Sequence, residues 1–313
     1  MVRKESFAFP SVFGGAEIHG VRYLPEGEIR GVLQISHGMV EYIERYEDFA
    51  RYLAERGILV TGNDHLGHGA SIRSKEDYGY FAEPDGNGAV LADLYRLTQI
   101  TKAAWPDRPY FLLGHSMGSF YARQYLCEYG RELDGAILMG TGCQPRALVR
   151  TGKALCALLA RFKGWRHRSR FVDDLAFGGY NKRFTPARTP RDWLTKDEKS
   201  VDAYIADERC SFLFTLNAYH SMFTGIDRLY DRALLDRMPK DLPVFFVAGA
   251  EDPVGDFSKG VLRVVEMFRD VGMERVDWKL YPGDRHEILH ELDRQTVYED
   301  LFRWLEARLD ERG

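Results

Sequence analysis

In the first part of the chain, short apolar runs alternate with stretches whose apolar residues recur at helical spacing. The apolar runs predict strands at residues 17–24, 30–36, 57–64, 109–114 and 133–140. The amphipathic stretches predict helices at residues 45–57, 86–105 and 117–130. Runs such as PYFLLG are apolar at nearly every position, as in strands buried on both faces of a sheet. The alternation therefore predicts an α/β protein with a mostly parallel sheet between two layers of helices.

This alternation of strand and helix patterns stops in the middle of the chain. Residues 144–235 have a helical or irregular pattern and contain no convincing strand. Strand and helix patterns then resume, with strands at residues 242–249 and 276–282 and helices at residues 258–272 and 295–309. We therefore predict an α/β core formed by residues 1–143 and 236–313, with residues 144–235 inserted as a helical cap.

Composition is typical of a globular protein. The 313 residues suffice for one large α/β domain with ample core. The 45% hydrophobic and 29% charged content argues against a disordered chain, a fibrous protein or a membrane bundle. The net charge of −4 gives no general reason to expect a nucleic-acid partner. No window reaches the roughly 18 apolar residues that a transmembrane helix needs.

Cysteine spacing and the N-terminal residues indicate the compartment. The four cysteines are widely spaced and include no C-x-x-C pair; they are Cys127, Cys143, Cys156 and Cys210. A disulfide framework or a thiolate zinc site is therefore not expected, and reduced thiols are the default. The N-terminal residues MVRKESFAFPSVFGG lack the continuous apolar stretch of a signal peptide. Together these features predict a cytoplasmic protein.

The predicted cap is strongly basic. Residues 144–193 contain twelve Lys or Arg and three acidic residues, a net charge of +9 in a chain whose total is −4. Such a block can be a solvated face. It can also meet anionic lipid headgroups, because residues 147–165 (ALVRTGKALCALLARFKGW) have the pattern of a basic amphipathic helix. Peripheral contact with an anionic membrane is thus a second interpretation of this segment.

The segment LLGHSMGS carries the strongest chemical signal. Residues 114–118 form a G-x-S-x-G pattern between a predicted buried strand and a predicted helix. Small residues two positions before and after Ser116 permit the tight turn that projects a serine hydroxyl from the end of a strand. We therefore predict that Ser116 is a nucleophile rather than a structural turn residue.

The segment LQISHGMVEY follows an earlier strand and predicts an oxyanion hole. A His-Gly pair there lets the backbone turn so that the N–H of Met39 points toward the reacting carbonyl. The N–H of Met117, at the start of the predicted helix, would be the second donor. Each such donor typically supplies about 3 kcal/mol of transition-state stabilisation. The alternative for the first segment is an ordinary glycine turn.

The segment VAGAEDPVGD provides a candidate acid after a buried strand. Asp252 is preferred because it stands at the strand exit, before a proline that stiffens the loop. Its carboxylate would accept a hydrogen bond from a histidine and fix the working tautomer. Glu251 is the alternative acid.

The segment GDRHEILHE allows two interpretations. On a helix, His286, Glu287 and His290 would form the H-E-x-x-H of a zinc protease. However, Pro282 and Gly283 place His286 in a loop or at a helix start, and the order Ser116, Asp252, His286 is that of α/β-hydrolases. We therefore predict that His286 is the general base, that no metal is bound, and that His290 lies on the surface or on a helix face.

A second pair of histidines, His65 and His68, lies in the glycine-rich segment NDHLGHGAS after a predicted strand. We expect this segment to shape the floor of the site rather than to bind a metal.

Taken together, these motifs resemble the monoacylglycerol lipase and bacterial lysophospholipase group of α/β-hydrolases, which is related to the serine aminopeptidases. The resemblance runs over nearly the whole chain and rests on SHGMVEYIERY, DHLGHGAS, GHSMGS, AGAEDPVG, HEILHE and DWLTKDEKSVDAYIAD. It implies an α/β-hydrolase fold with a cap that admits an acyl chain. Ser116, Asp252 and His286 match the triad of the group, and Met39 and Met117 match its oxyanion positions. His290 departs from the asparagine that the group leads us to expect, and Met39 replaces a smaller residue.

The resemblance implies a serine hydrolase that cleaves carboxylic esters of acylglycerols or lysophospholipids without a cofactor. A short-chain carboxylesterase and a proline aminopeptidase stay open as alternatives, although an aminopeptidase needs an acidic cap site and this cap is basic. A ligand-binding module with this fold is the non-enzyme alternative. Such modules often lack a triad member, whereas this chain has candidates for all three.

Overall fold

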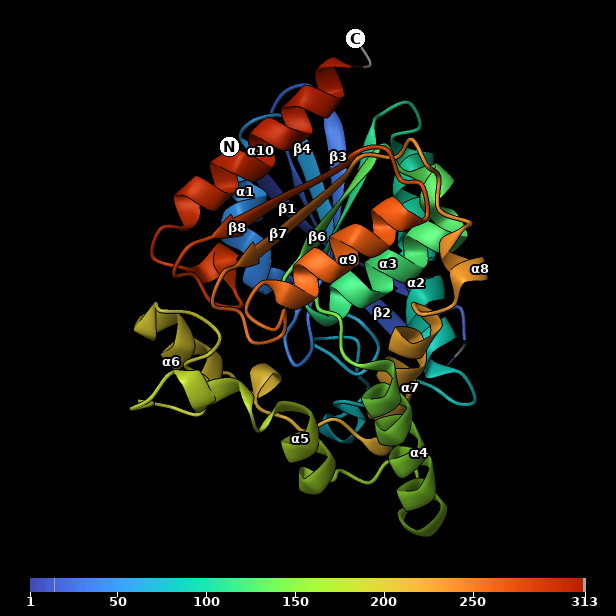
Figure 1. Cartoon of the computed structure of the whole chain (residues 1–313). Coiled ribbons are helices and arrows are strands. Elements are labelled where there is room, and N and C mark those ends of the chain that lie inside the picture. Colours follow the sequence, from blue (N-terminus) through green and yellow to red (C-terminus); the bar gives the residue numbers. More distant parts are fainter. Residues whose placement is uncertain (14, 312–313) are drawn as a thin grey trace.

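The computed structural model describes residues 1–13 and 15–311. Its strands form one sheet in the order β1-β2-β4-β3-β5-β6-β7-β8 (Figure 1). The β1–β2 and β2–β4 pairs are antiparallel, and the other pairs are parallel. The strands are β1 (Arg3–Pro10), β2 (Glu17–Leu24), β3 (Gly31–Ser36), β4 (Ile58–Asn63), β5 (Tyr110–His115), β6 (Gly135–Met139), β7 (Val244–Gly249) and β8 (Val276–Tyr281).

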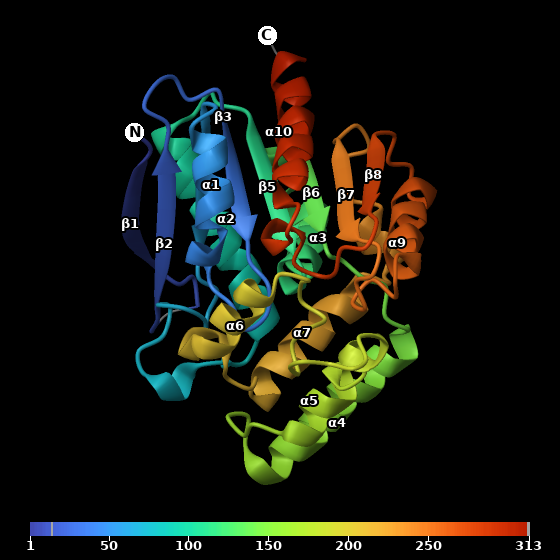
Figure 2. The same ribbon diagram turned by 90° about the vertical axis from the view of Figure 1, so that its left-hand side faces the viewer.

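Helices cover both faces of the sheet (Figure 2). One apolar core joins the sheet to α2 (Gly86–Ala104), α3 (Met117–Tyr129) and α9 (Lys259–Asp270). The other joins it to α1 (Glu47–Ala54) and α10 (Arg294–Asp310). Every residue of β3 through β7 is buried, which explains why these strands are mostly apolar. The predicted α/β class, with a mostly parallel sheet covered on both faces, is confirmed.

Strand β1, at the edge of the sheet, is absent from the elements predicted from the sequence. Its residues form no apolar run, and most of its side chains are at least partly exposed. The strand forms because it pairs with β2 along its whole length, from Arg3 opposite Leu24 to Pro10 opposite Glu17. Pairing of this kind depends on a neighbouring strand and leaves little signal in the local sequence.

Between β6 and β7 the chain is helical, as expected for a cap. It forms α4 (Arg146–Lys163), α5 (Arg170–Phe177), α6 (Glu198–Ala206), α7 (Leu216–Arg228) and α8 (Arg232–Leu235). Helix α4 packs against α7, and these helices lie beyond the carboxyl ends of the central strands (Figures 1 and 2). Within the described residues of this segment, the isolated bridge between Arg168 and Thr215 is the only strand-like pairing. The division into core and cap at residues 143/144 and 235/236 stays a prediction.

Short 3-10 helices lie in the connecting segments, at Ile43–Tyr46, Lys75–Asp77, Gly130–Glu132, Tyr180–Arg183, Glu208–Cys210 and Ile288–His290. Among the residues that the structure describes, no helix has both the length and the apolar character needed to cross a bilayer.

Candidate active site

Ser116 lies at a sharp turn between β5 and α3. Its φ of 52° is positive, which residues other than glycine rarely adopt. The N–H of Ser116 donates to the carbonyl of Met139 at 3.0 Å, which ties the turn to β6. A Cβ on Gly118 would lie 1.9 Å from the Ser36 carbonyl oxygen, and one on Gly114 would lie 2.5 Å from the Gly118 carbonyl oxygen. The turn therefore needs glycine at both positions, which accounts for the G-x-S-x-G pattern.

His286 and Asp252 meet from the loops that follow β8 and β7. Nδ1 of His286 lies 2.9 Å from Oδ2 of Asp252, and the two side chains are 3% and 0% exposed. The other carboxylate oxygen of Asp252 accepts the N–H of Val254 at 2.8 Å, which fixes the carboxylate. A partner at Nδ1 leaves Nε2 as the nitrogen that can exchange a proton with a reacting group. Glu251 has an exposed side chain, so this arrangement favours Asp252 as the acid.

One cavity is lined by Ser116, His286, Met39 and Met117 together. Met117 is the first residue of α3, and N–H groups in the first turn of a helix have no carbonyl partner within the helix. Met39 follows β3, the neighbour of β5 in the sheet. Four of the five residues predicted for the site thus share one cavity, and the fifth, Asp252, contacts His286.

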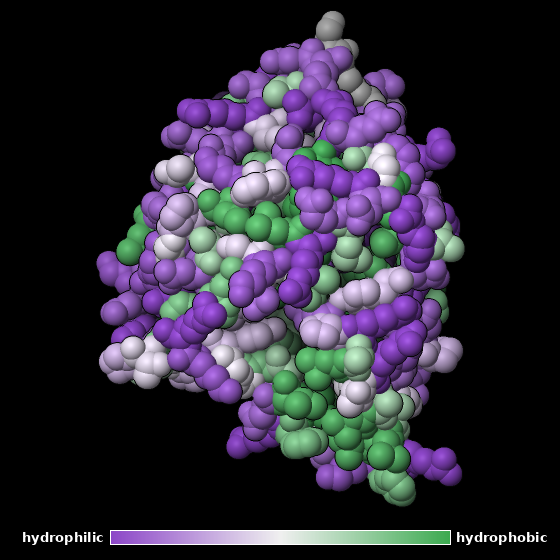
Figure 3. All heavy atoms as spheres, viewed as in Figure 1, coloured by the Kyte–Doolittle hydropathy of each residue, from purple (hydrophilic) through white to green (hydrophobic). Residues whose placement is uncertain are grey.

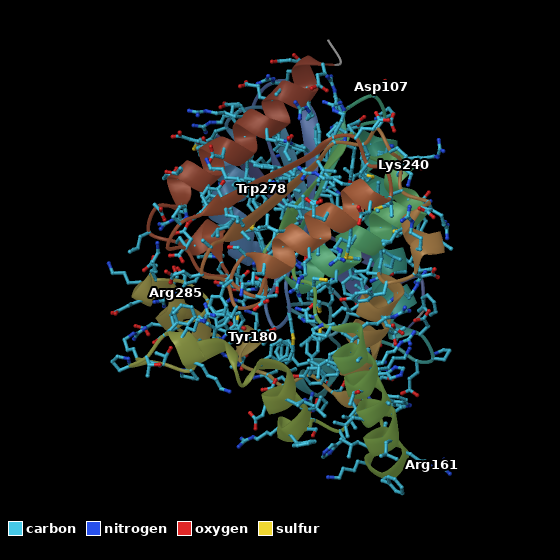
Figure 4. The ribbon with its side chains drawn as sticks, viewed as in Figure 1. Asp107, Arg161, Tyr180, Lys240, Trp278 and Arg285 are labelled. Atoms are coloured by element: carbon cyan, nitrogen blue, oxygen red, sulfur yellow. The ribbon has the colours of Figure 1, made fainter. Side chains whose placement is uncertain are left out.

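Most of the residues that line the cavity come from the segment between β6 and β7. Apolar side chains of α4, α5 and α7 form one side, namely Leu148, Val149, Val172, Leu175, Ala176, Met222, Phe223 and Ile226. The ring of Trp193 lies 5.1 Å from that of His286, and the ring of Tyr180 lies 5.0 Å from that of Trp193. Figure 4 shows Tyr180 between the cap ribbon and the core. An apolar part of a substrate would therefore lie between the cap and Ser116.

A buried charged network surrounds this cavity. Arg45 binds both oxygens of Glu287 at 2.7 and 2.8 Å, and it also binds Glu41 at 2.8 Å. The other oxygen of Glu41 lies 2.9 Å from the Tyr46 hydroxyl and 3.2 Å from Nδ1 of His115. Apart from Glu287 in the zinc-protease alternative, no role is predicted for these residues from the sequence. The spacing of Glu41 and Arg45, four positions apart, was the one local signal for such a pair.

These contacts set the protonation of the network. Burial alone would raise the pKa of Glu41, but its hydrogen bond with His115 and the charge of Arg45 hold that pKa well below its usual range. Burial opposes ionisation of Glu287 as well, and Arg45 lowers its pKa to about 2. For His115, burial lowers the pKa, but the hydrogen bond and charge of Glu41 raise it above its usual value. The network therefore holds two carboxylates in their charged form beside the cavity.

The H-E-x-x-H segment does not place its two histidines on one helix face. Its 3-10 helix covers only Ile288–His290, so His286 and Glu287 precede it. Glu287 is bound to Arg45, and Nε2 of His290 lies 3.1 Å from the Arg45 carbonyl oxygen. The side chain of His290 is 21% exposed, so it is more buried than predicted for a surface residue. This geometry favours His286 as the partner of Asp252 over the zinc-protease interpretation.

His65 and His68 pack against His37, in the loop that follows β3, rather than on the cavity floor. The ring of His37 lies 4.1 Å from that of His65 and 5.2 Å from that of His68, and all three residues are buried. The N–H of His65 donates to Nε2 of His37 at 2.9 Å. Neither His65 nor His68 is among the described residues that line the cavity, which differs from the sequence-based expectation. Their packing supports the start of the His37-Gly38 turn.

The chain is similar in sequence and in fold to known lipases and esterases. The family model described as serine aminopeptidase, S33, matches residues 27–293. The chain is 27% identical over 308 residues to monoacylglycerol lipase of Mycolicibacterium smegmatis, covering 95% of each protein. It is 26% identical over 298 residues to mouse monoglyceride lipase, covering 92% of this chain and 86% of that protein. A thermostable carboxyl esterase of Bacillus coagulans, solved with glycerol, has a TM-score of 0.91 and 27% identity over 99% of this chain and 100% of its own.

Proposed function

This chain belongs to the serine aminopeptidase S33 family, and on that basis we propose that Ser116, His286 and Asp252 form its catalytic triad. It has the α/β-hydrolase fold predicted from the sequence and is a serine hydrolase of carboxylic esters. We propose monoacylglycerols or lysophospholipids as substrates. The observation that most supports the proposed function is the contact between His286 and Asp252, which lies beside a largely apolar cavity that is also lined by Ser116.

The proposed reaction has two steps. Nε2 of His286 takes the proton of the Ser116 hydroxyl while Oγ of Ser116 attacks the ester carbonyl. Asp252 stabilises the imidazolium that forms on His286. The N–H groups of Met39 and Met117 hold the tetrahedral oxyanion. His286 then gives its proton to the leaving alcohol, and the acyl group remains on Ser116. In the second step His286 takes a proton from water, and the water oxygen attacks the acyl-enzyme. The carboxylic acid is released and Ser116 is regenerated, so these steps require no cofactor.

The shape and charge of the cavity favour a lipid ester over the alternatives. Its apolar wall over α4, α5 and α7 suits an acyl chain longer than that of a short-chain ester. A proline aminopeptidase needs a free carboxylate for the substrate amine. In this cavity, Glu41 and Glu287 are bound to Arg45, and Asp173 accepts the Tyr219 hydroxyl. The presence of all three triad candidates favours an enzyme over a ligand-binding module.

We propose that residues 144–235 act as a cap that also contacts membranes. Large apolar side chains are exposed on α4 and α5, namely Leu148, Leu158, Phe162, Phe171 and Leu175. Figure 3 shows apolar side chains gathered over α4, at the end of the molecule away from both termini. Leu148 and Leu175 also line the cavity, so a continuous apolar path leads from this surface toward Ser116. Exposed apolar residues beside basic ones are the pattern of a segment that lies on an anionic bilayer.

We propose the cytoplasm as the compartment, with peripheral association at membranes. The four cysteines are free thiols, the state that a reducing compartment maintains.

An activity panel tests the proposed function. It contains p-nitrophenyl esters of increasing chain length, a monoacylglycerol, lysophosphatidylcholine and a proline anilide. We expect hydrolysis of the long-chain esters and of at least one of the two lipids, and no cleavage of the anilide. Activity limited to acetyl and butyryl esters would instead support the short-chain carboxylesterase.

A further inference from the structure

Arg191 is a half-buried cation in the lining of the cavity that contains Ser116. The carboxylates of this lining already have partners, because Glu41 and Glu287 bind Arg45 and Asp173 lies 2.5 Å from the Tyr219 hydroxyl. Within the described part of the chain, no carboxylate lies within ion-pair distance of Arg191. Among the described residues, the Arg191 guanidinium therefore has no ion-pair partner, and it is available to an anionic group of a ligand in this cavity.

Tyr204 locates this charge relative to the reacting centre. Its hydroxyl donates to the carbonyl of Val40, the residue after Met39, at 2.9 Å. Burial raises the pKa of Tyr204, and among charged groups Arg191 opposes this rise most strongly. Arg45 opposes it less, although its guanidinium lies 4.9 Å from the Tyr204 ring. Arg191 and Tyr204 line the same cavity, and the hydrogen bond of Tyr204 joins this part of the lining to the loop that would supply one oxyanion donor.

The backbone holds Arg191 on a fixed turn. Its N–H donates to Oγ1 of Thr189 at 3.1 Å, and its carbonyl accepts the N–H of Leu194 at 3.0 Å. Within this turn, the ring of Trp193 lies 5.1 Å from the ring of His286. This turn therefore fixes the backbone of Arg191 two residues before Trp193, whose ring contacts the proposed general base.

We propose that Arg191 binds the phosphate of a lysophospholipid headgroup, so that the enzyme prefers esters whose alcohol carries a phosphate over neutral monoacylglycerols. This inference rests on the proposed function. Arg191 lines the same cavity as Ser116, so a phosphate on the alcohol of an ester bound at Ser116 would share this cavity with the guanidinium. A guanidinium presents a planar set of donors that matches two phosphate oxygens. Its charge acts more strongly in an apolar cavity than in water.

The test compares two esters that differ only in the phosphate. These are 1-octanoylglycerol and 1-octanoylglycerol 3-phosphate, both used as monomers below their critical micelle concentrations. Monomers are essential because the basic cap would attract an anionic micelle whatever Arg191 does. The measured quantity is the ratio of kcat/KM for the phosphate ester to kcat/KM for the neutral ester, at physiological salt.

We expect Arg191→Gln to lower this ratio by about tenfold or more, because a charge-assisted hydrogen bond is lost. Arg191→Glu should lower it further, and Arg191→Lys should lower it less than Arg191→Gln. Arg188→Gln is the matched control, since Arg188 lies on the same segment, pairs with Asp202 at 2.7 Å and is not in the cavity lining. A ratio that stays within about twofold of wild type in both Arg191→Gln and Arg191→Glu would overturn the inference.

A binding measurement separates this inference from the proposed function. Calorimetry in the Ser116→Ala background compares octanoylglycerol 3-phosphate with glycerol 3-phosphate and inorganic phosphate, with and without Arg191→Gln. We expect binding of the octanoyl ester to be the tightest and to depend on Arg191. Equal binding of inorganic phosphate would indicate a site for free phosphate and overturn the headgroup assignment. If wild type hydrolysed neither ester, Arg191-dependent binding would still support the inference while the proposed function failed.

Discussion

Arg45 forms a bidentate ion pair with Glu287, at 2.7 and 2.8 Å, and Glu287 is the residue after His286. The same guanidinium binds Glu41 at 2.8 Å, and the other oxygen of Glu41 accepts the N–H of Gly38 at 2.5 Å. One buried cation therefore connects the loop of the proposed general base with the loop of the proposed oxyanion hole. These loops are far apart in the sequence, and the network fixes their positions relative to each other.

We predict that Glu287→Gln lowers kcat by about tenfold to a hundredfold while KM changes less, because a buried charged contact is worth about 1–3 kcal/mol. Glu287 would act as a positioning residue, so the variant should fold and still bind substrate. Steady-state kinetics with a long-chain ester measures both constants. Glu306→Gln is the control, since its partner Arg30 and Glu306 itself are 38% and 40% exposed. Equal kcat values in the two variants would contradict this role.

The two histidines of the H-E-x-x-H segment should differ in importance. His286→Ala should be nearly inactive because it removes the group that contacts Asp252. His290→Ala should keep most of the activity, because it loses only the contact between Nε2 and the Arg45 carbonyl. Ester hydrolysis by the two variants, with and without a chelator, makes the comparison. Equal loss in both variants, together with recovery of stripped wild type on adding zinc, would restore the metalloprotease interpretation.

Stability should fall in mild acid because of the buried cluster of His37, His65 and His68. Burial lowers the pKa of all three, and that of His68 falls from 6.5 to about 3. Between about pH 3 and pH 6.5, His68 therefore binds a proton in the unfolded chain but not in the folded chain. The stabilising contribution is therefore complete above about pH 6.5 and is lost as the pH falls toward 3.

Urea unfolding between pH 5 and 6.5 measures this dependence. One excluded proton corresponds to a slope of about 1.4 kcal/mol per pH unit. The comparison of His68→Gln with wild type removes the contributions of other titrating groups. The variant should show a shallower slope by up to this amount. An unchanged slope would mean that His68 does not exclude a proton in the folded state.

The sequence predicted those parts of the site that depend on local constraints. The turn at Ser116 needs glycine at positions 114 and 118 for steric reasons, so its pattern is visible in five residues. The contact of Asp252 with His286 follows from two adjacent parallel strands, β7 and β8, whose carboxyl ends lie at the same edge of the sheet.

Long-range contacts were not predictable in the same way. Arg45 and Glu287 are separated by 242 positions, and nothing in either segment specifies the other as its partner. The position of His68 behind His37 depends on how the loop after β4 packs against β3, which a motif does not encode. Strand β1 was missed because the neighbouring strand β2 determines it.

The basic cap should bind anionic membranes through its exposed apolar residues. Phe162 is 77% exposed and stands between Arg161 and Lys163 at the end of α4. Each basic residue near an anionic bilayer contributes about 1 kcal/mol, and salt screens this attraction beyond about 10 Å. Co-sedimentation with vesicles should therefore be stronger for anionic than for neutral lipid and weaker at high salt.

Two variants distinguish the cap from the rest of the surface. Phe162→Ser should reduce vesicle binding. Trp278→Ser should not, because Trp278 is 46% exposed on β8, away from the end of α4 that Arg161 marks in Figure 4. Binding that ignores lipid charge, salt and Phe162 would leave the basic cap as a solvated face.

The proposed mechanism depends above all on Ser116 as the nucleophile. The most direct measurement is labelling by a fluorophosphonate probe, with the modified residue identified by mass spectrometry and ester hydrolysis followed in parallel. We predict that wild type is labelled at Ser116, and that Ser116→Ala is unlabelled and loses hydrolysis by roughly 10⁴-fold or more, because triad members act as a unit. Labelling at another serine in the Ser116→Ala variant, with hydrolysis retained, would show that Ser116 is not the nucleophile.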